Sequence, residues 1–247
     1  MSEPTPPFLL SPNLITDKEF KSYRVNREPI SEVNQVVKNA INKPELQSSH
    51  QKSAILDPEA RKNEFSITLK IFLKDFDTLK AQEAIDQILE ILGTEYVENL
   101  NLALPEMGCD ALGFTSDNVD PNTTSEHREN LIKLWRFLEK LVDRKVIKNL
   151  GISDVETEVF KYIFNNVKIK PNNVQVNQTT CCVVPPELKI FAKDNDVHLL
   201  THNDPPIIWN PKCESLQKFN LRWIIRSLVH IEARGVLKDK RYAISLE

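Results

Sequence analysis

The chain has 247 residues, of which 40% are hydrophobic and 27% charged, with a formal net charge of −3. This composition is typical of a globular protein and gives no reason to expect nucleic acid or an anionic membrane as a partner. The N-terminal "MSEPTPPFLL" has an acidic residue and prolines where a signal peptide has basic residues, and no apolar run approaches the ~20 residues that span a bilayer. With only four cysteines, the chain is expected to be cytoplasmic and to lack a disulfide scaffold.

Glycine is scarce, and its spacing excludes the common phosphate-binding motifs. A dinucleotide-binding turn or a P-loop needs closely spaced glycines so that the backbone can approach phosphate. No two glycines of this chain form a G-x-G pair; they are Gly93, Gly108, Gly113, Gly151 and Gly235.

The first elements predicted along the chain are a strand, a helix and a second strand–helix pair. "FLLSPNLI" is a candidate strand, and "ISEVNQVVKNAI" carries apolar residues at helical spacing. Phe65–Leu73 is short and rich in apolar and β-branched residues, which predicts a strand. The helix that follows has Asp77 or Thr78 as a candidate N-cap and Gly93 where a left-handed residue ends it.

The alternation of strands and helices continues to the C-terminus. The motif Ser153–Glu156 matches a capping box, S-x-x-E, and predicts a helix start. Strands are expected over 97–104, 146–152, 173–178, 197–201 and near 229–233, and helices over 129–145, 155–166, 185–195 and 215–228.

This alternation predicts βαβ units and a parallel sheet in an α/β fold. Six strands are expected from residue 65 onward, and the first 60 residues would supply the two more that a closed (β/α)8 TIM barrel needs. We therefore expect one barrel domain over residues 1–247, with an irregular N-terminal portion over 1–60. An open doubly wound sheet is the alternative on pattern alone.

Several segments between residues 60 and 247 resemble known proteins. "GISDVE", "KPNNVQVNQTTCCVVPPEL", "FAKDNDVHLLTHNDP" and "RGVLKDKRYAI" are similar to the aldo-keto reductase superfamily and, more narrowly, to its glutamate–cysteine ligase regulatory (modifier) subunits. The resemblance implies an aldo-keto reductase barrel without catalytic activity of its own. It implies a heterodimer with the catalytic subunit of the ATP-dependent ligase, in which glutamate use improves and feedback inhibition by glutathione is relieved.

The residues also bear on reductase chemistry. The resemblance places Lys70 at the lysine of the reductase active site, but Ala103 stands where the family has a histidine. No tyrosine occurs between Tyr23 and Tyr96, so the family's D-x-x-x-Y-G run with its proton donor is absent. We expect Lys70 to be a vestigial position, paired with a carboxylate such as Glu106, and no catalytic residue. An NADP-dependent reductase or an NADPH-binding sensor is the alternative.

A cofactor is not expected, although part of a nicotinamide site persists by resemblance. Ser153 and Gln175 match two positions that hold the nicotinamide amide in reductases, and Ser153 would also cap its helix without any cofactor. The family's basic phosphate-binding segment is not recognisable.

Two adjacent cysteines, Cys181 and Cys182, raise the question of redox regulation. C-C is not a structural zinc spacing, so no metal is expected. Neighbours in an extended segment point to opposite faces, so one thiol packs as a small hydrophobe while the other points outward. The hypothesis is a disulfide to the catalytic subunit, with Cys213 as the second candidate.

The segment "THNDPP" places three polar residues after a predicted strand. His202, Asn203 and Asp204 would contact the partner, or Asn203 or Asp204 would form an Asx-type turn before Pro205.

Overall fold

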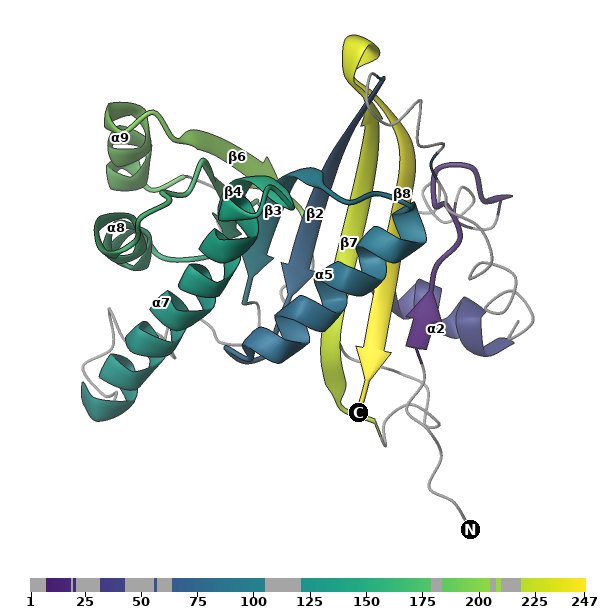
Figure 1. Ribbon diagram of the computed structural model, residues 1–247, viewed down its shortest axis with the longest axis horizontal. Helices are drawn as coiled ribbons and strands as arrows, with labels where there is room; N and C mark the ends of the chain where they lie inside the picture. Colours follow the sequence, from purple (N-terminus) through teal and green to yellow (C-terminus); the bar gives the residue numbers. More distant parts are fainter. Residues whose placement is uncertain are drawn as a thin grey trace.

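The computed structural model describes residues 8–18, 20, 32–42, 56, 64–104, 121–178, 184–204, 208–209 and 219–247. One eight-stranded sheet organises them, in the strand order β1-β8-β7-β2-β3-β4-β5-β6 (Figure 1). The elements are β1 (Phe8–Leu10), α2 (Glu32–Asn42), β2 (Phe65–Phe72), α5 (Thr78–Leu92), β3 (Val97–Ala103), α7 (Pro121–Asp143), β4 (Ile147–Ser153), α8 (Thr157–Asn166), β5 (Asn173–Asn177), α9 (Pro186–Asp194), β6 (His198–His202), β7 (Leu221–Ile231), η1 (Glu232–Arg234) and β8 (Val236–Leu246).

The βαβ units predicted between residues 65 and 202 are confirmed. Strands β2 to β6 are parallel neighbours in sequence order, and a helix follows each of β2 to β5. The carboxylate of Asp77 accepts hydrogen bonds from the N–H groups of Leu79 and Lys80 at the start of α5. Gly93 ends the helix with φ of 70°, as its position predicted.

The last third of the chain differs from the prediction. The helix expected over 215–228 is wrong from residue 221 onward, because β7 occupies Leu221–Ile231 and pairs antiparallel with β2. The strand expected near 229–233 is the end of β7 and the turn η1. Strand β8 is antiparallel to β7, and β1 is antiparallel to β8. The sheet thus has the expected eight strands, but seven follow residue 64 and three depart from the parallel pattern.

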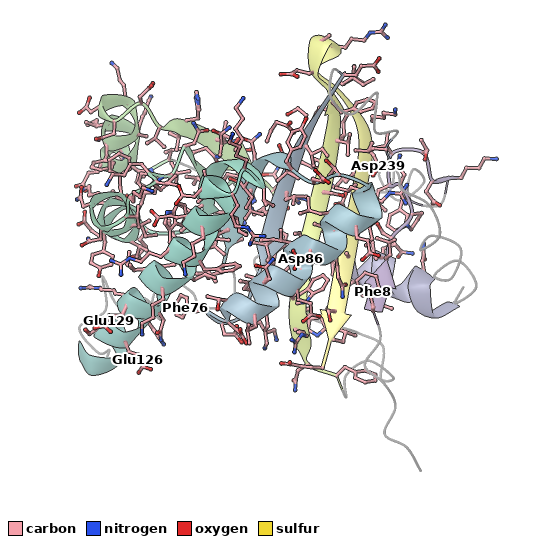
Figure 2. All side chains as sticks on the ribbon, in the orientation of Figure 1. Phe8, Phe76, Asp86, Glu126, Glu129 and Asp239 are labelled. Carbon is pink, nitrogen blue, oxygen red and sulfur yellow. The ribbon has the colours of Figure 1, made fainter. Side chains whose placement is uncertain are left out.

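Helices α5, α7, α8 and α9 cover one face of the sheet with a continuous apolar core. In Figure 1, α5 and α7 cross in front of the strands. Ile85 and Trp135 from these helices are fully buried with Leu69 and Leu102 of the strands, whereas Asp86 points to solvent from the outer side of α5 (Figure 2). No helix among the described residues is both long and apolar enough to cross a membrane.

The opposite face of the sheet is divided into an apolar part and a polar part. Near β7 and β8, α2 packs through Val33, Val36 and Val37 in a second core that includes Ile224 and Ile244. Polar side chains occupy the same face over β2 to β6, at alternate positions of each strand. These polar positions are Thr68, Lys70, Asn99, Asn101, Asn149, Ser153, Asn173, Gln175, Asn177, His198 and His202.

Candidate functional site: a buried charge cluster at the strand ends

A row of polar residues crosses the sheet at one level. Lys70 on β2 is the register partner of Arg226 on β7, which is in turn the partner of Tyr242 on β8. On its other side Lys70 pairs with Asn101 of β3. The antiparallel strands therefore bring an arginine and a tyrosine from the C-terminal part of the chain beside the lysine.

Five charged side chains meet above this row and are called here the charge cluster: Lys70, Asp154, His202, Asp204 and Arg226. Lys70 Nζ lies 2.8 Å from Asp204 Oδ2 and 3.7 Å from Asp154 Oδ2. His202 contacts the same two carboxylates, with Nε2 2.8 Å from Asp154 Oδ1 and Nδ1 3.0 Å from Asp204 Oδ2. Arg226 donates to both oxygens of Asp204, at 3.2 Å from Nη2 and through a shorter bond from Nη1. Lys70, Asp154, His202 and Asp204 thus form a closed ring of contacts, and Arg226 joins it at Asp204.

The backbone after β4 and β6 positions the two aspartates. Asp154 follows β4 with a positive φ of 61°, and its N–H donates to the carbonyl of Gln175 at 3.0 Å. Asp204 follows β6, and its carbonyl accepts a hydrogen bond from Asn177 Nδ2 at 2.8 Å. Short polar side chains tolerate the left-handed conformation, so an aspartate at 154 suits the turn as well as the cluster.

Burial and neighbouring charges set the pKa values of the cluster. Burial lowers the pKa of the Lys70 ammonium, and Asp204 and Asp154 offset this only in part. Burial alone would raise the pKa of the Asp204 carboxyl, but the hydrogen bond from His202 and the charges of Arg226 and Lys70 hold that pKa far below its usual range. For His202, burial lowers the pKa while the hydrogen bonds to Asp154 and Asp204 raise it, and the net result is a raised pKa.

A second group of ionisable residues continues from Arg226 towards α2. Arg226 Nη1 lies 3.4 Å from the hydroxyl of Tyr242, and this hydroxyl donates to Glu32 Oε2 at 3.0 Å. Lys240 Nζ also contacts Glu32. Burial raises the pKa of the Tyr242 phenol, and the charge of Glu32 raises it further. The chain of contacts joins the first helix of the described structure to its last strand.

The arrangement differs from a reductase proton-transfer site. Lys70 is only 2% exposed and its ammonium is engaged with Asp204, so the predicted ion pair is present with another carboxylate than Glu106, which lies outside the described residues. The Tyr242 hydroxyl donates a hydrogen bond to Glu32, and the pKa of Tyr242 is raised. A phenol that protonates a carbonyl has a lowered pKa instead. The ionisable side chains of the charge cluster are paired with one another and are not placed to transfer a proton to a substrate.

Ser153 and Gln175 lie side by side at the ends of β4 and β5. The Ser153 hydroxyl donates to Gln175 Oε1 at 3.0 Å. The predicted capping box is wrong, because β4 continues through Ser153 and α8 begins at Thr157 after Glu156, which makes no capping hydrogen bond with its side chain. Asp154 is committed to His202 and, as a carboxylate, has no N–H for a nicotinamide carbonyl. As they stand, these three side chains do not fit a nicotinamide, which agrees with the expectation that no cofactor binds through Ser153 and Gln175.

The predicted partner segment His202–Asp204 lies within the described residues. Asp204 is buried in the charge cluster, His202 is half-buried beside it, and Asn203 is exposed. Asp204 therefore forms long-range ion pairs instead of the Asx turn considered from the sequence. Three further candidates, Cys181, Cys182 and Cys213, lie outside the described residues. Within the described residues no group of three or more His, Cys, Asp or Glu could hold a metal ion.

Sequence reasoning missed Arg226, Tyr242 and Glu32. The spacing of apolar residues predicts a helix over 215–228, and a helix would not place Arg226 in register with Lys70. Alternation of Arg226 with the apolar residues of β7 is the signal that could have placed it, but both faces of β7 are largely buried.

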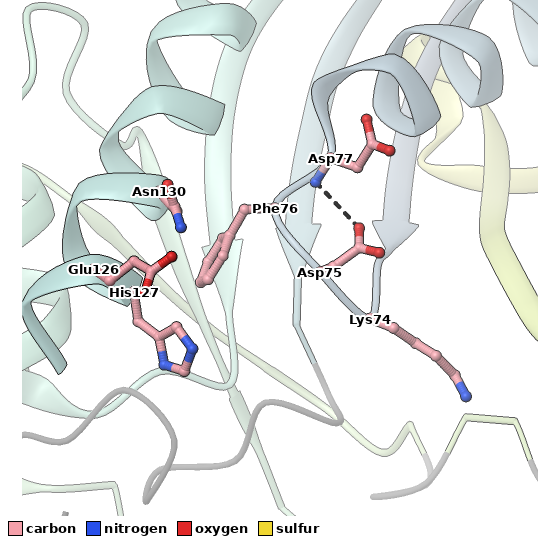
Figure 3. A pocket seen from close by; sticks show the side chains of 7 residues that line it. All are labelled: Lys74, Asp75, Phe76, Asp77, Glu126, His127 and Asn130. Atoms are coloured by element: carbon pink, nitrogen blue, oxygen red, sulfur yellow. Dashed lines mark hydrogen bonds between the residues drawn. The ribbon is translucent and has the colours of Figure 1, made fainter. Parts of the chain in front are cut away.

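A shallow pocket of about 530 Å³ lies between the β2–α5 connection and α7 (Figure 3). Two of its three acidic side chains serve the local fold: Asp75 accepts from the N–H of Asp77 and pairs with Lys80, and Asp77 caps α5. The ring of Phe76 contacts that of His127 at 5.8 Å. We therefore place the candidate site at the charge cluster and not here.

Comparisons with known proteins identify the family of this chain. The aldo/keto reductase family model matches residues 36–203. The glutamate–cysteine ligase regulatory subunit of Homo sapiens is 30% identical over 201 residues, covering 76% of this chain and 68% of that protein. The Rattus norvegicus regulatory subunit is 30% identical over 202 residues with the same coverage. A crystal structure of a Bombyx mori aldo-keto reductase in complex with NADP is 15% identical, with a TM-score of 0.42, and covers 69% of this chain and 47% of that one.

The predicted α/β fold of aldo-keto reductase type is confirmed by the family match and the strand–helix units that it spans. The chain belongs to the aldo-keto reductase family and, within it, to the glutamate–cysteine ligase regulatory subunits.

Proposed function

We propose that this chain is a non-catalytic regulatory subunit of glutamate–cysteine ligase that acts in the cytoplasm. It binds the ligase catalytic subunit, improves its use of glutamate and relieves feedback inhibition by glutathione. The observation that carries the proposal is the 30% identity to the human regulatory subunit over 76% of the chain.

The charge cluster supports the non-catalytic part of the proposal. A reductase needs a phenol that gives a proton to a carbonyl and a lysine that lowers the phenol's pKa. In this chain Lys70 is paired with Asp204, and the Tyr242 hydroxyl donates a hydrogen bond to Glu32. Neither group is available for proton transfer without breaking a buried bond. Incubation with NADPH and a panel of aldehydes is expected to give no oxidation of NADPH; turnover would contradict this part of the proposal.

Regulation by binding amounts to a coupling free energy between the subunit interface and the ligase's glutamate and glutathione sites. Couplings of this kind are typically ~1–3 kcal/mol, which corresponds to about 5–150-fold in affinity. The test is to co-express the chain with a ligase catalytic subunit, purify the complex, and measure the KM for glutamate and the inhibition by glutathione with and without the chain. A lower KM and weaker inhibition are expected. Failure to form a complex, or a complex with unchanged kinetics, would reject the proposal.

We further propose that Cys181 or Cys182 forms a disulfide with the catalytic subunit. The sequence predicts an extended segment at these two cysteines, in which neighbouring side chains point to opposite sides, so one thiol is expected to face outward. Non-reducing electrophoresis of the co-expressed pair is expected to show a cross-linked band that disappears in the Cys181→Ser/Cys182→Ser double variant. Cys213→Ser is the matched control, and it becomes the candidate if the band survives the double variant.

A further inference from the structure

Strand β6 forms an open edge of the sheet. It pairs with β5 on one side, and no strand among the described residues lies on its other side. The N–H of His198 donates to Asn172, and the carbonyl of His202 accepts from Gln178, so the backbone groups of these residues face β5. Because backbone groups alternate along a strand, the N–H and C=O of Leu199 and Thr201 are directed at the open side.

The side chains of β6 reflect the same exposure. The inner parallel strands β2, β3 and β4 each end in four buried residues, whereas no residue of β6 is fully buried. Leu200 is 45% exposed on the polar face of the sheet, and Thr201 is also exposed. Parallel sheets are normally covered on both faces, so an open strand of this kind is unusual.

Within its own five residues, strand β6 lacks the sequence features that keep sheet edges from pairing. Natural edge strands carry lysine, proline or a β-bulge, or are very short. The sequence His198–His202 has neither lysine nor proline, and its register with β5 is continuous over five residues. The other edge, β1, has only three residues. The β6 edge is thus the one that could accept a further strand.

We propose that the open edge of β6 binds an extended segment of the ligase catalytic subunit, which adds a strand to the sheet. This inference rests on the proposed function. The segment's backbone pairs with the free N–H and C=O groups of Leu199 and Thr201, and one apolar side chain of the segment covers Leu200.

The size of the edge argues for this partner over a second copy of the chain. Two β6 strands pairing with each other would bury five residues on each side, far below the ~800 Å² per partner of a standard stable interface. A partner that binds elsewhere as well, as a regulatory complex requires, uses the edge as one element of a larger interface.

The decisive variant is Thr201→Pro. Its N–H points to the open side, so proline removes a bond to the added strand and leaves the β5–β6 ladder intact. The matched control is Thr201→Val, which keeps the N–H. The affinity for the purified catalytic subunit is expected to fall at least about tenfold for Thr201→Pro, since each lost hydrogen bond and the steric block of its neighbours contribute, and to change less than about twofold for Thr201→Val.

A second pair of variants guards against a folding defect. Leu200→Glu puts a charge on the edge, and Leu79→Glu puts the same charge on α5 at a residue that is 74% exposed. Only Leu200→Glu is expected to weaken the complex. In the wild-type complex, the amides of Leu199 and Thr201 should gain protection from hydrogen exchange.

The outcomes separate the two proposals. If the wild-type chain does not bind the catalytic subunit, the proposed function fails. If the wild type binds and Thr201→Pro and Leu200→Glu bind equally well, the edge proposal alone is overturned. If sedimentation shows a wild-type homodimer that Thr201→Pro abolishes while the ligase complex persists, the edge belongs to a second copy and the proposed occupant is wrong.

Discussion

Lys70 and Asp204 are 134 residues apart in sequence, yet Lys70 Nζ lies 2.8 Å from Asp204 Oδ2 inside the protein. Asp204 also binds Arg226 and lies within 3.0 Å of His202 Nδ1, so one carboxylate compensates three cationic side chains. The stability of the strand ends therefore depends on this aspartate more than on any single cation around it.

Asp204→Asn is expected to lower the free energy of unfolding by about 3–5 kcal/mol, because it removes the nearest carboxylate from the buried Lys70 and from Arg226, whose side chain is only 11% exposed. Urea denaturation measures the loss. Asp194→Asn, at an exposed position of α9, is the control and should change the free energy by less than about 0.5 kcal/mol. A loss for Asp204→Asn below about 1 kcal/mol would mean that the cluster behaves like a surface ion pair.

His202 makes the stability depend on pH. Its pKa is raised in the folded state, so its contribution is fully present below the ordinary histidine pKa of about 6.5 and is lost as the pH rises through the raised value. The pKa of Asp204 is lowered, so its contribution is present above about pH 3.9 and is lost as the pH falls through the lowered value. Stability from these two groups is therefore greatest between about pH 4 and 6.5.

The geometry shows what the loss of the proton does. His202 Nδ1 lies 3.0 Å from Asp204 Oδ2 and 3.1 Å from the N–H of the same residue. The protonated ring donates to the carboxylate, and the neutral ring accepts from the N–H. His202→Gln should flatten the fall of the thermal midpoint above pH 6.5, whereas the exposed His198→Gln should keep it. Equal profiles for both variants would contradict this assignment.

The neighbours of Gly151 leave no room for a side chain at this position. A Cβ there would lie 2.0 Å from Asn101 Oδ1 and 2.4 Å from both side-chain amide atoms of Asn173. Both asparagines are nearly fully buried, so Gly151→Ala is expected to cost about 1–3 kcal/mol or more through overpacking. Gly235→Ala is the contrasting control, since nothing lies within 4 Å and only its φ of +60° is unfavourable. In Gly151→Ala, the added changes Asn101→Ala and Asn173→Ala together should recover part of the lost stability, because they remove both clashing side chains; no recovery would show that the clash is not the cause.

Tyr242→Phe tests the link between α2 and the sheet. The variant removes the hydrogen bond to Glu32 and is expected to cost about 1–3 kcal/mol. Hydrogen exchange should accelerate over Glu32–Asn42, where Glu32 anchors the helix, while α5 in the same variant serves as the internal control. Equal acceleration in both helices would indicate global unfolding and not loss of a local anchor.

The strand–helix units up to β6 could be predicted because each carries its own signals. Asp77 and Gly93 mark the two ends of α5, and the β-branched run of β2 is short. β7 could not be predicted in the same way. It lies between β8 and β2 with both faces largely buried, so Leu221, Ile224, Ile225 and Leu228 also fit a helical spacing.

The candidate site shows the same division. Lys70 could be found from its resemblance to the family, and an ion pair could be expected for a lysine at such a position. The side chains around Lys70 could not be predicted, because Asp204 follows β6 and Arg226 lies on β7, and only the topology of the sheet brings these strands together. Ser153 shows that a local motif is not sufficient: its hydroxyl binds Gln175 across the strands instead of the helix start.

The pairing of β2 with β7 and of β1 with β8 has a consequence for synthesis on the ribosome. Residues Phe65–Phe72 acquire their antiparallel neighbour only when residues 221–231 have been made, and Phe8–Leu10 must wait for residues 243–245. The five parallel strands emerge earlier, with the β7 side of β2 still exposed. During synthesis the β7 side of β2 therefore stays without its neighbour strand until residues 221–231 have been made, and an unpaired strand of this kind is prone to pair with another chain.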